Sequence, residues 1–226
     1  MKPALAIMSR VPSPEGKSRL HGILSPEQRE ALQWALLEDT IEKAAQLPEL
    51  EIFLSLTPAS QIYRMKMINL NGAQIIVQPE GGLGERMLAA VQLLFRQNYA
   101  PVILIGTDSP ALAPEHLVKA LDLLEDYQLV IGPAKDGGYY LIGMRYPEDR
   151  IFKDISWGSH KVLEETMISC DKFGIKCCLL NLIGDIDRPE DLLEFIDDID
   201  LEEKLFSISK NNKTIHLLRL WKDGIQ

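Results

Sequence analysis

The stretch PVILIGTDSPAL, residues 101–112, joins an apolar run to a carboxylate. Residues 102–105 are Val-Ile-Leu-Ile, which is typical of a strand buried on both faces, and Pro110 ends the segment. Asp108 therefore lies where a buried strand ends. In open α/β sheets, ligands bind beyond the carboxyl ends of the strands, and a carboxylate there can hold a cation. The alternative is that Asp108 only caps the turn into the next helix.

Short apolar runs alternate with helical patterns on both sides of this stretch. The sequence predicts further strands at 4–8, 51–56, 74–78, 129–131, 139–144 and 175–182. It predicts helices at 25–47, from 60 onward, and at 85–97, 114–124, 161–167 and 189–195. This alternation indicates an α/β fold with three layers and a doubly wound, mostly parallel sheet. Residues 136–138 are too short for a parallel crossover, so one strand is expected to be antiparallel and the sheet mixed.

Length, charge and cysteine content limit the number of domains and the partners that this protein is expected to have. The chain has 226 residues, and we expect one domain at 1–199 followed by a C-terminal appendage at 200–226. The net charge is −9, from 24 basic and 33 acidic residues, which argues against nucleic acid as a partner. No apolar stretch approaches a membrane span, and the start has no signal-peptide pattern. Three cysteines without a C-x-x-C pair indicate a reducing compartment, so a cytoplasmic protein is expected.

A basic loop follows the first predicted strand. Gly16-Lys17-Ser18 is similar to the end of a phosphate loop, but Val11 stands where that motif needs glycine, and nearby prolines remove backbone donors. We therefore reject the phosphate loop. Lys17 and Arg19 can still neutralise a triphosphate, and the alternative is a solvated basic loop. A G-x-G-x-x-G pattern is absent, which argues against a dinucleotide cofactor.

Two glycine-rich connections and a second acidic turn complete the motifs. Gly81-Gly82-Leu83-Gly84 precedes a helix and can bring backbone close to a base, or it is a flexible turn. Asp136-Gly137-Gly138 joins two strands, as a hairpin turn or as a substrate contact. Asp187 is either the N-cap of a helix, with Glu190 completing a capping box, or a second metal ligand. Asp185 competes for the ligand role.

Five motifs together resemble a known family. They are GKSRL at 16–20, GGLGERM at 81–87, IGTDSPAL at 105–112, GPAKDGGYYLIGM at 132–144 and DIDRPEDL at 185–192. In this order they resemble small glycosyltransferase-like proteins with the nucleotide-sugar transferase (GT-A) fold. These proteins are commonly labelled arsenosugar-biosynthesis or radical-SAM-associated glycosyltransferases. More distantly, the pattern is similar to phospholactate and molybdenum-cofactor guanylyltransferases. The resemblance covers residues 2–197.

The resemblance implies roles for individual residues. It implies that Asp108 and Asp187 hold Mg²⁺ (or Mn²⁺) on the nucleotide phosphates, and that Lys17 contacts those phosphates. It further implies catalytic roles for Lys17, Asp108 and Asp136, with Asp136 orienting the acceptor or acting as base. The nucleotide-binding residues it implies are Arg10, Lys17, Arg19, Gly82, Gly84 and Arg86. The acceptor-binding residues it implies are Gly137 and Gly138.

Three functions are compatible with these motifs. The family resemblance favours a Mg²⁺-dependent glycosyltransferase-like enzyme that uses a nucleotide sugar and a small-molecule acceptor. The alternative is a nucleotidyltransferase that moves a nucleoside monophosphate from a triphosphate to a phosphorylated small molecule. The single acid in Thr107-Asp108-Ser109, instead of an Asp-x-Asp, favours this alternative. The third is a nucleotide-binding protein without turnover. A homo-oligomer is compatible with all three.

Overall fold

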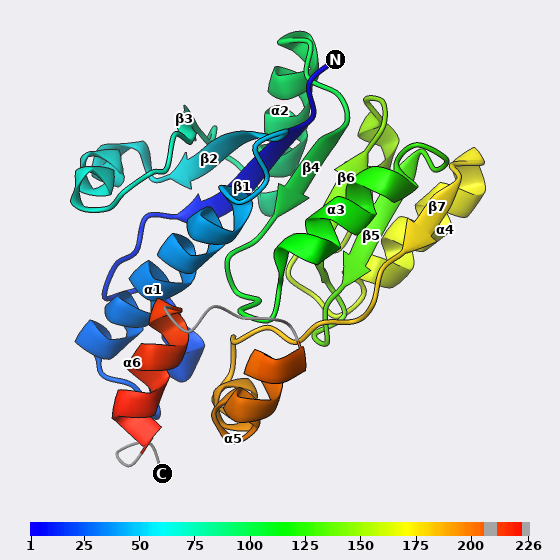
Figure 1. The fold of residues 1–226 in the computed structure, drawn as a ribbon. Helices are drawn as coiled ribbons and strands as arrows, with labels where there is room; N and C mark the ends of the chain where they lie inside the picture. The colour runs from blue at the N-terminus through cyan, green and yellow to red at the C-terminus, as the bar shows by residue number, and fades with distance from the viewer. Residues whose placement is uncertain (206–211, 223–226) are drawn as a thin grey trace.

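A mixed sheet of seven strands forms the centre of the protein (Figure 1). The computed structural model describes residues 1–205 and 212–222. The strands are β1 (Ala4–Arg10), β2 (Glu51–Thr57), β3 (Gln74–Val77), β4 (Val102–Ile105), β5 (Leu129–Pro133), β6 (Tyr139–Met144) and β7 (Cys177–Leu179). Their order is β3-β2-β1-β4-β6-β5-β7, and only the pairs that include β6 are antiparallel. The predicted mixed, doubly wound sheet is confirmed.

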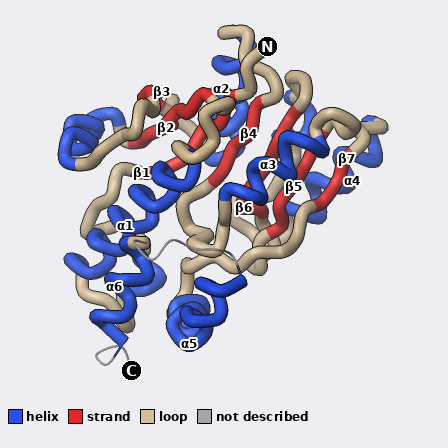
Figure 2. Tube along the Cα trace, viewed as in Figure 1, coloured by secondary structure: helices blue, strands red, loops and turns tan. Residues whose placement is uncertain are grey.

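Helices cover both faces of this sheet, as Figure 2 shows. The α-helices are α1 (Pro26–Ala44), α2 (Leu83–Arg96), α3 (Pro114–Leu123), α4 (Val162–Phe173), α5 (Pro189–Leu205) and α6 (Lys213–Trp221). Helices α1 and α3 pack on one face, and α2 and α4 pack on the other. The capping box predicted at the start of α1 is present, with Ser25 accepting from the Gln28 backbone N–H.

Alternation along the strands builds two separate cores. In β1, Leu5 and Ile7 join the core under α1 and α3, whereas Ala4 and Ala6 join the core under α2 and α4. This is the two-residue period of a strand buried on both faces. The three predicted layers are therefore present.

Several element boundaries differ from the prediction. The last strand is only Cys177–Leu179, and the helix predicted from residue 60 is a 3-10 helix at Ala59–Met67. Helix α5 extends ten residues beyond the predicted end at residue 195, to Leu205. Local patterns locate an element well, but its ends depend on partners that are distant in sequence.

The C-terminal helix docks on the main body. The Asp39 carboxylate of α1 accepts backbone N–H groups of Lys213 and Thr214, each at 2.8 Å. Ile215 and Leu218 lie in a third apolar cluster with residues of α1 and α5. Helix α6 is thus packed against α1, while residues 206–211 and 223–226 of the predicted appendage lie outside the described residues. No helix of the described chain has the length and apolar character needed to cross a membrane.

Candidate active site

A cavity of about 690 Å³ opens at the edge of the sheet where the parallel strands end. Loops after β1 and β4, the turn before β6 and the segment after β7 all contribute to it. Most residues predicted from the sequence line it: Arg10, Lys17, Arg19, Arg86, Asp108, Asp136, Gly138 and Asp187. This is the edge at which open α/β sheets bind ligands.

Asp108 and Lys17 form an ion pair in the lining of the cavity. The Lys17 ammonium lies 2.8 Å from Asp108 Oδ1 and also donates to the Ile186 carbonyl. The Lys17 backbone is left-handed, with φ of 49°, a conformation that is uncommon for residues other than glycine. Asp108 does not cap the next helix, because α3 begins at Pro114 with Ala113 as its N-cap. The alternative that Asp108 only caps the next helix is therefore wrong, and its carboxylate lines the cavity.

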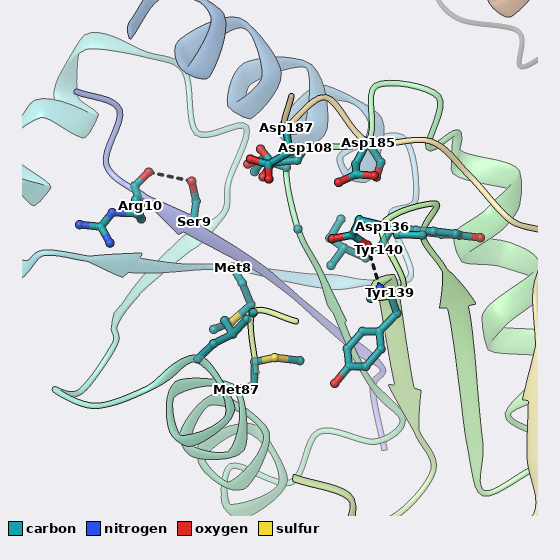
Figure 3. A pocket seen from close by; sticks show the side chains of 18 of the residues that line it. Met8, Ser9, Arg10, Met87, Asp108, Asp136, Tyr139, Tyr140, Asp185 and Asp187 are labelled. Atoms are coloured by element: carbon teal, nitrogen blue, oxygen red, sulfur yellow. Dashed lines mark hydrogen bonds between the residues drawn. The ribbon is translucent and has the colours of Figure 1, made fainter. Parts of the chain in front are cut away.

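Asp187 reaches the same place from the segment between β7 and α5 (Figure 3). The backbone N–H of Ile186 donates to the Asp108 carbonyl at 2.8 Å, which joins the two acidic segments. The Asp187 carboxylate pairs with Arg19. The predicted capping box with Glu190 is wrong, because Asp191 accepts the N–H groups of Asp187 and Arg188 instead. Asp191 thereby frees the Asp187 side chain for the cavity.

Two further aspartates line the cavity. Asp136 Oδ1 accepts the N–H of Gly138 at 2.7 Å, which closes the hairpin turn between β5 and β6. Desolvation, together with the charges of Asp136, Asp191 and Asp108, raises the pKa of Asp185 to about 6. A carboxyl group whose pKa is raised in this way is typical of a functional site.

The predicted glycines divide into two kinds. Gly82 begins α2 and its N–H donates to Glu85 Oε2 at 2.7 Å. Gly84 is buried under the Trp157 indole, where a Cβ would lie 2.1 Å from Nε1. At Gly137, φ is +88° and a Cβ would lie 2.2 Å from the His160 carbonyl oxygen. Gly84 and Gly137 are therefore needed for close packing against residues 157–160.

Two predicted arginines line the cavity without a carboxylate partner among the described residues. Arg10 ends β1, is exposed, and in Figure 3 points away from the aspartates. Arg86 is half-buried in the first turn of α2, and its Nε is buried without a hydrogen-bond partner in the part of the chain described. A guanidinium with unsatisfied donors suits a phosphate, a carboxylate or a base edge.

Sequence reasoning missed the side chains that hold the Lys17 loop. Arg29 on α1 donates to the carbonyls of Pro14 and Gly16, and Gln33, one turn later, donates to the Ser13 carbonyl. Lys43, further along α1, donates to the Pro110 carbonyl at 2.5 Å, and desolvation lowers its pKa to about 8. The polar residues 29 and 33, four apart on one helix face, were the available signal.

The carboxylates suit a hard cation that phosphate oxygens also bind. Asp108 and Asp187 offer oxygen ligands from two segments joined by a backbone hydrogen bond. Within residues 1–205 and 212–222, no group of three or more His, Cys, Asp or Glu side chains is arranged to hold a metal. A magnesium ion here would therefore need ligands from a nucleotide as well as from the two aspartates.

Known proteins with similar sequences and structures are nucleotide-dependent transferases. The 2-phospho-L-lactate guanylyltransferase of Methanococcoides burtonii is 28% identical over 186 residues, which cover 80% of this chain and 78% of the relative. That of Methanoregula boonei is 28% identical over 183 residues, covering 80% and 76%. A crystal structure from Desulfovibrio desulfuricans G20, described as a candidate nucleotide-diphospho-sugar transferase, superposes with a TM-score of 0.88 at 28% identity, covering 99% and 96%.

A more distant structure agrees on the fold. CMP:2-keto-3-deoxy-manno-octonic acid synthetase complexed with CTP gives a TM-score of 0.57 at 13% identity, covering 90% of this chain and 100% of that one. The nucleotide-diphospho-sugar transferase fold implied by the motifs is thus confirmed, whereas the arsenosugar label stays a prediction. The profile of DUF2064, described as an uncharacterized protein conserved in bacteria, matches residues 40–159, more than half of the chain. The chain belongs to the DUF2064 family within the nucleotide-diphospho-sugar transferase fold.

Proposed function

We propose that this protein is a Mg²⁺-dependent nucleotidyltransferase that moves a nucleoside monophosphate from a triphosphate to a phosphorylated small molecule. The observation that carries the proposal is the pair of carboxylates, Asp108 and Asp187, each paired with a basic side chain at one sheet edge. Asp108 is the one acid of Thr107-Asp108-Ser109, and Asp187 comes from a separate segment, so an ion held by both would also bind the oxygens of a triphosphate. The guanylyltransferase relatives support the same choice.

The proposed reaction is a displacement at phosphorus. An oxygen of the acceptor phosphate bonds to the α-phosphorus, the bond from that phosphorus to the α–β bridging oxygen breaks, and pyrophosphate leaves with the electron pair. Lys17 and Arg19 stabilise the charge on the leaving pyrophosphate. Asp108 and Asp187 would hold Mg²⁺, which when bound neutralises phosphate charge. Asp136 orients the acceptor beside the hairpin turn.

Pyrophosphate release tests the proposal directly. The purified chain would be mixed with Mg²⁺, each of GTP, CTP, UTP and ATP, and either 2-phospho-L-lactate or phenyl phosphate as the acceptor, with GTP first because of the relatives' names. We expect acceptor-dependent pyrophosphate release that Asp108→Asn and Asp187→Asn reduce by about a hundredfold or more. Asp126→Asn is the matched control, because Asp126 is exposed and precedes β5 at the opposite edge of the sheet. Equal rates in all variants would refute the metal assignment.

Glycosyl transfer is the second candidate, because the Desulfovibrio desulfuricans structure is described as a nucleotide-diphospho-sugar transferase. The two reactions release different products. Glycosyl transfer from a nucleotide sugar releases a nucleoside diphosphate, whereas nucleotidyl transfer releases pyrophosphate. Release of a nucleoside diphosphate from a nucleotide sugar, without pyrophosphate release from any triphosphate, would replace the first proposal with the second.

A further inference from the structure

The cavity has two chemically different halves. Figure 3 shows Asp108, Asp136, Asp185 and Asp187 on one side, and Met8, Met87 and Tyr139 on the other. Uncharged side chains line this second half, which we call the apolar half: Met8, Met87, Leu104, Tyr139, Ile142, Trp157 and Val162. The roles proposed above for the site use only the charged half.

The floor of the apolar half is the sheet itself. Leu104 of β4 is paired with Ile142 of β6 and, on its other side, with Ala6 of β1, two residues before Met8. These side chains point to the face that α2 and α4 cover. Met87 of α2 and Val162 of α4 form the sides. The cavity thus continues from the sheet edge into the layer between the sheet and these two helices.

Aromatic packing fixes one wall of the apolar half. The Trp157 ring stacks on Phe152, with centroids 6.3 Å apart and planes at 21°. Its edge contact with Tyr139 has centroids 6.2 Å apart, and Gly84 leaves room for the indole on α2. The N–H of Leu163 donates to the Gly137 carbonyl at 2.9 Å, which ties this segment to the hairpin turn. The wall is therefore preformed, which lowers the entropy cost of binding.

The lining of this half selects against a charged occupant. The charged residues of the cavity come from the loops at the sheet edge, from Arg10 and from Arg86 in the first turn of α2. A charged or strongly hydrated group would lose water against Leu104, Ile142 and Val162, whose side chains have no polar atom. The Tyr139 hydroxyl, buried without a hydrogen-bond partner among the described residues, is uncharged and could pair with at most one polar atom, in one part of this half. Thioethers and aromatic rings instead favour a flat or branched apolar group.

We propose that the acceptor is amphipathic, with its phosphate in the charged half and an uncharged aromatic or branched aliphatic body in the apolar half. Lys17, Arg19 and a Mg²⁺ ion held by Asp108 and Asp187 would offset the charge of the phosphate. This inference rests on the proposed nucleotidyl transfer for the position of the phosphate. Under this proposal the acceptor differs from phospholactate, for which the relatives are named and which has a small polar body. The competing occupant of the apolar half is the nucleobase of the donor.

Direct binding of phenyl phosphate and of inorganic phosphate, each in the presence of Mg²⁺, tests the proposal without turnover. By calorimetry we expect phenyl phosphate to bind the wild-type protein at least about tenfold more tightly, because the ring enters the apolar half. Val162→Phe fills this half and should abolish the preference. Val118→Phe is the matched control, since Val118 is exposed on α3, which covers the other face of the sheet. Met8→Trp fills the half from β1 and replaces Val162→Phe if that variant does not fold.

A second measurement separates this inference from the proposed function. Thermal shift with GTP and Mg²⁺ reports the donor site, and we expect the shift to be unchanged in Val162→Phe. If no nucleoside triphosphate raises the melting temperature of the wild type, the proposed function fails. The preference for phenyl phosphate over inorganic phosphate is then still tested by calorimetry alone. Equal binding of both phosphates, or loss of the GTP shift in Val162→Phe, would overturn the inference, the latter in favour of a nucleobase.

Discussion

The two ion pairs of the cavity are built in opposite ways. In the first, the Lys17 side chain is 6% exposed and its partner Asp108 is 51% exposed. In the second, the Arg19 side chain is 56% exposed and Asp187 is 27% exposed. The first pair thus turns its carboxylate toward the cavity and buries its cation, whereas the second exposes its cation.

This difference indicates that the two cations, Lys17 and Arg19, have different roles. Lys17 is fixed by the Ile186 carbonyl and by its left-handed backbone, so it is a preorganised charge. Arg19 has no such second anchor among the described residues and can follow a phosphate as it moves. The exposed Asp108 carboxylate is the group that an incoming cation reaches first. The pair with the buried cation, Lys17–Asp108, should therefore matter more for catalysis than the pair with the exposed cation, Arg19–Asp187.

Removing the buried cation should have the largest effect. Lys17→Met leaves Asp108 without its partner and the Ile186 carbonyl without this donor, and we expect kcat/KM for pyrophosphate release to fall about a hundredfold to a thousandfold. Steady-state kinetics with the best triphosphate measure the change. Lys119→Met, at an exposed position on α3, is the matched control. Activity of Lys17→Met within twofold of the wild type would remove Lys17 from the catalytic machinery.

Lys43 supports the Asp108 side of the first pair, and its effect should appear in stability. Desolvation lowers its pKa from 10.5 to about 8, so between these pH values the unfolded chain binds more protons than the folded one. The contribution of Lys43 to the free energy of unfolding therefore rises with pH across this window, by on the order of 3 kcal/mol. Urea unfolding at pH 7.5, 9 and 10 should show this rise relative to Lys43→Met. Parallel pH profiles for the two proteins would contradict the lowered pKa.

The exposed cation should give the smallest effect. Arg19→Met is expected to lower kcat/KM about tenfold or less, because water and salt screen an exposed pair. The difference from the wild type should shrink further when the assay is repeated in about 0.5 M salt, where the Debye length is only a few ångströms. A loss as large as that of Lys17→Met would show that burial does not distinguish the two pairs.

The sequence predicted the strands and the acidic turns because both are local signals. The run at 102–105 is apolar over its whole length, Asp108 follows three residues later, and Pro110 ends the segment. These local signals were sufficient to place the carboxylate near the end of a strand. The sequence could not show whether Glu190 or Asp191 accepts the backbone N–H groups at the start of α5. Glu190 lies three residues after Asp187 and Asp191 lies three residues after Arg188, so each fits the spacing of a capping box for a helix start that differs by one residue.

The hydrogen bonds that hold the loops of the site in place could not be predicted, because they join residues that are distant in sequence. Arg29 binds the carbonyls of a loop more than ten residues earlier, and Lys43 reaches Pro110 from another element. Such contacts appear only once the order of the strands is known. The apolar half of the cavity is another example, since Met8, Leu104 and Ile142 meet on one face of the sheet only through the pairing of three strands.

The antiparallel strand β6 has a consequence for how this scaffold can diversify. Because β6 runs against its neighbours, the hairpin tip at Asp136–Gly138 rises among the carboxyl ends of the parallel strands. This tip is held in place, because the Leu163 N–H donates to the Gly137 carbonyl and a Cβ at Gly137 would meet the His160 carbonyl oxygen. Since the length of a turn fixes the register of its hairpin, an insertion here would shift β6 against β5 and displace the segment at 157–163. A new acceptor specificity should therefore arise at this end of the cavity through side-chain substitutions at constant loop length, which leave the Lys17 and Asp108 end intact.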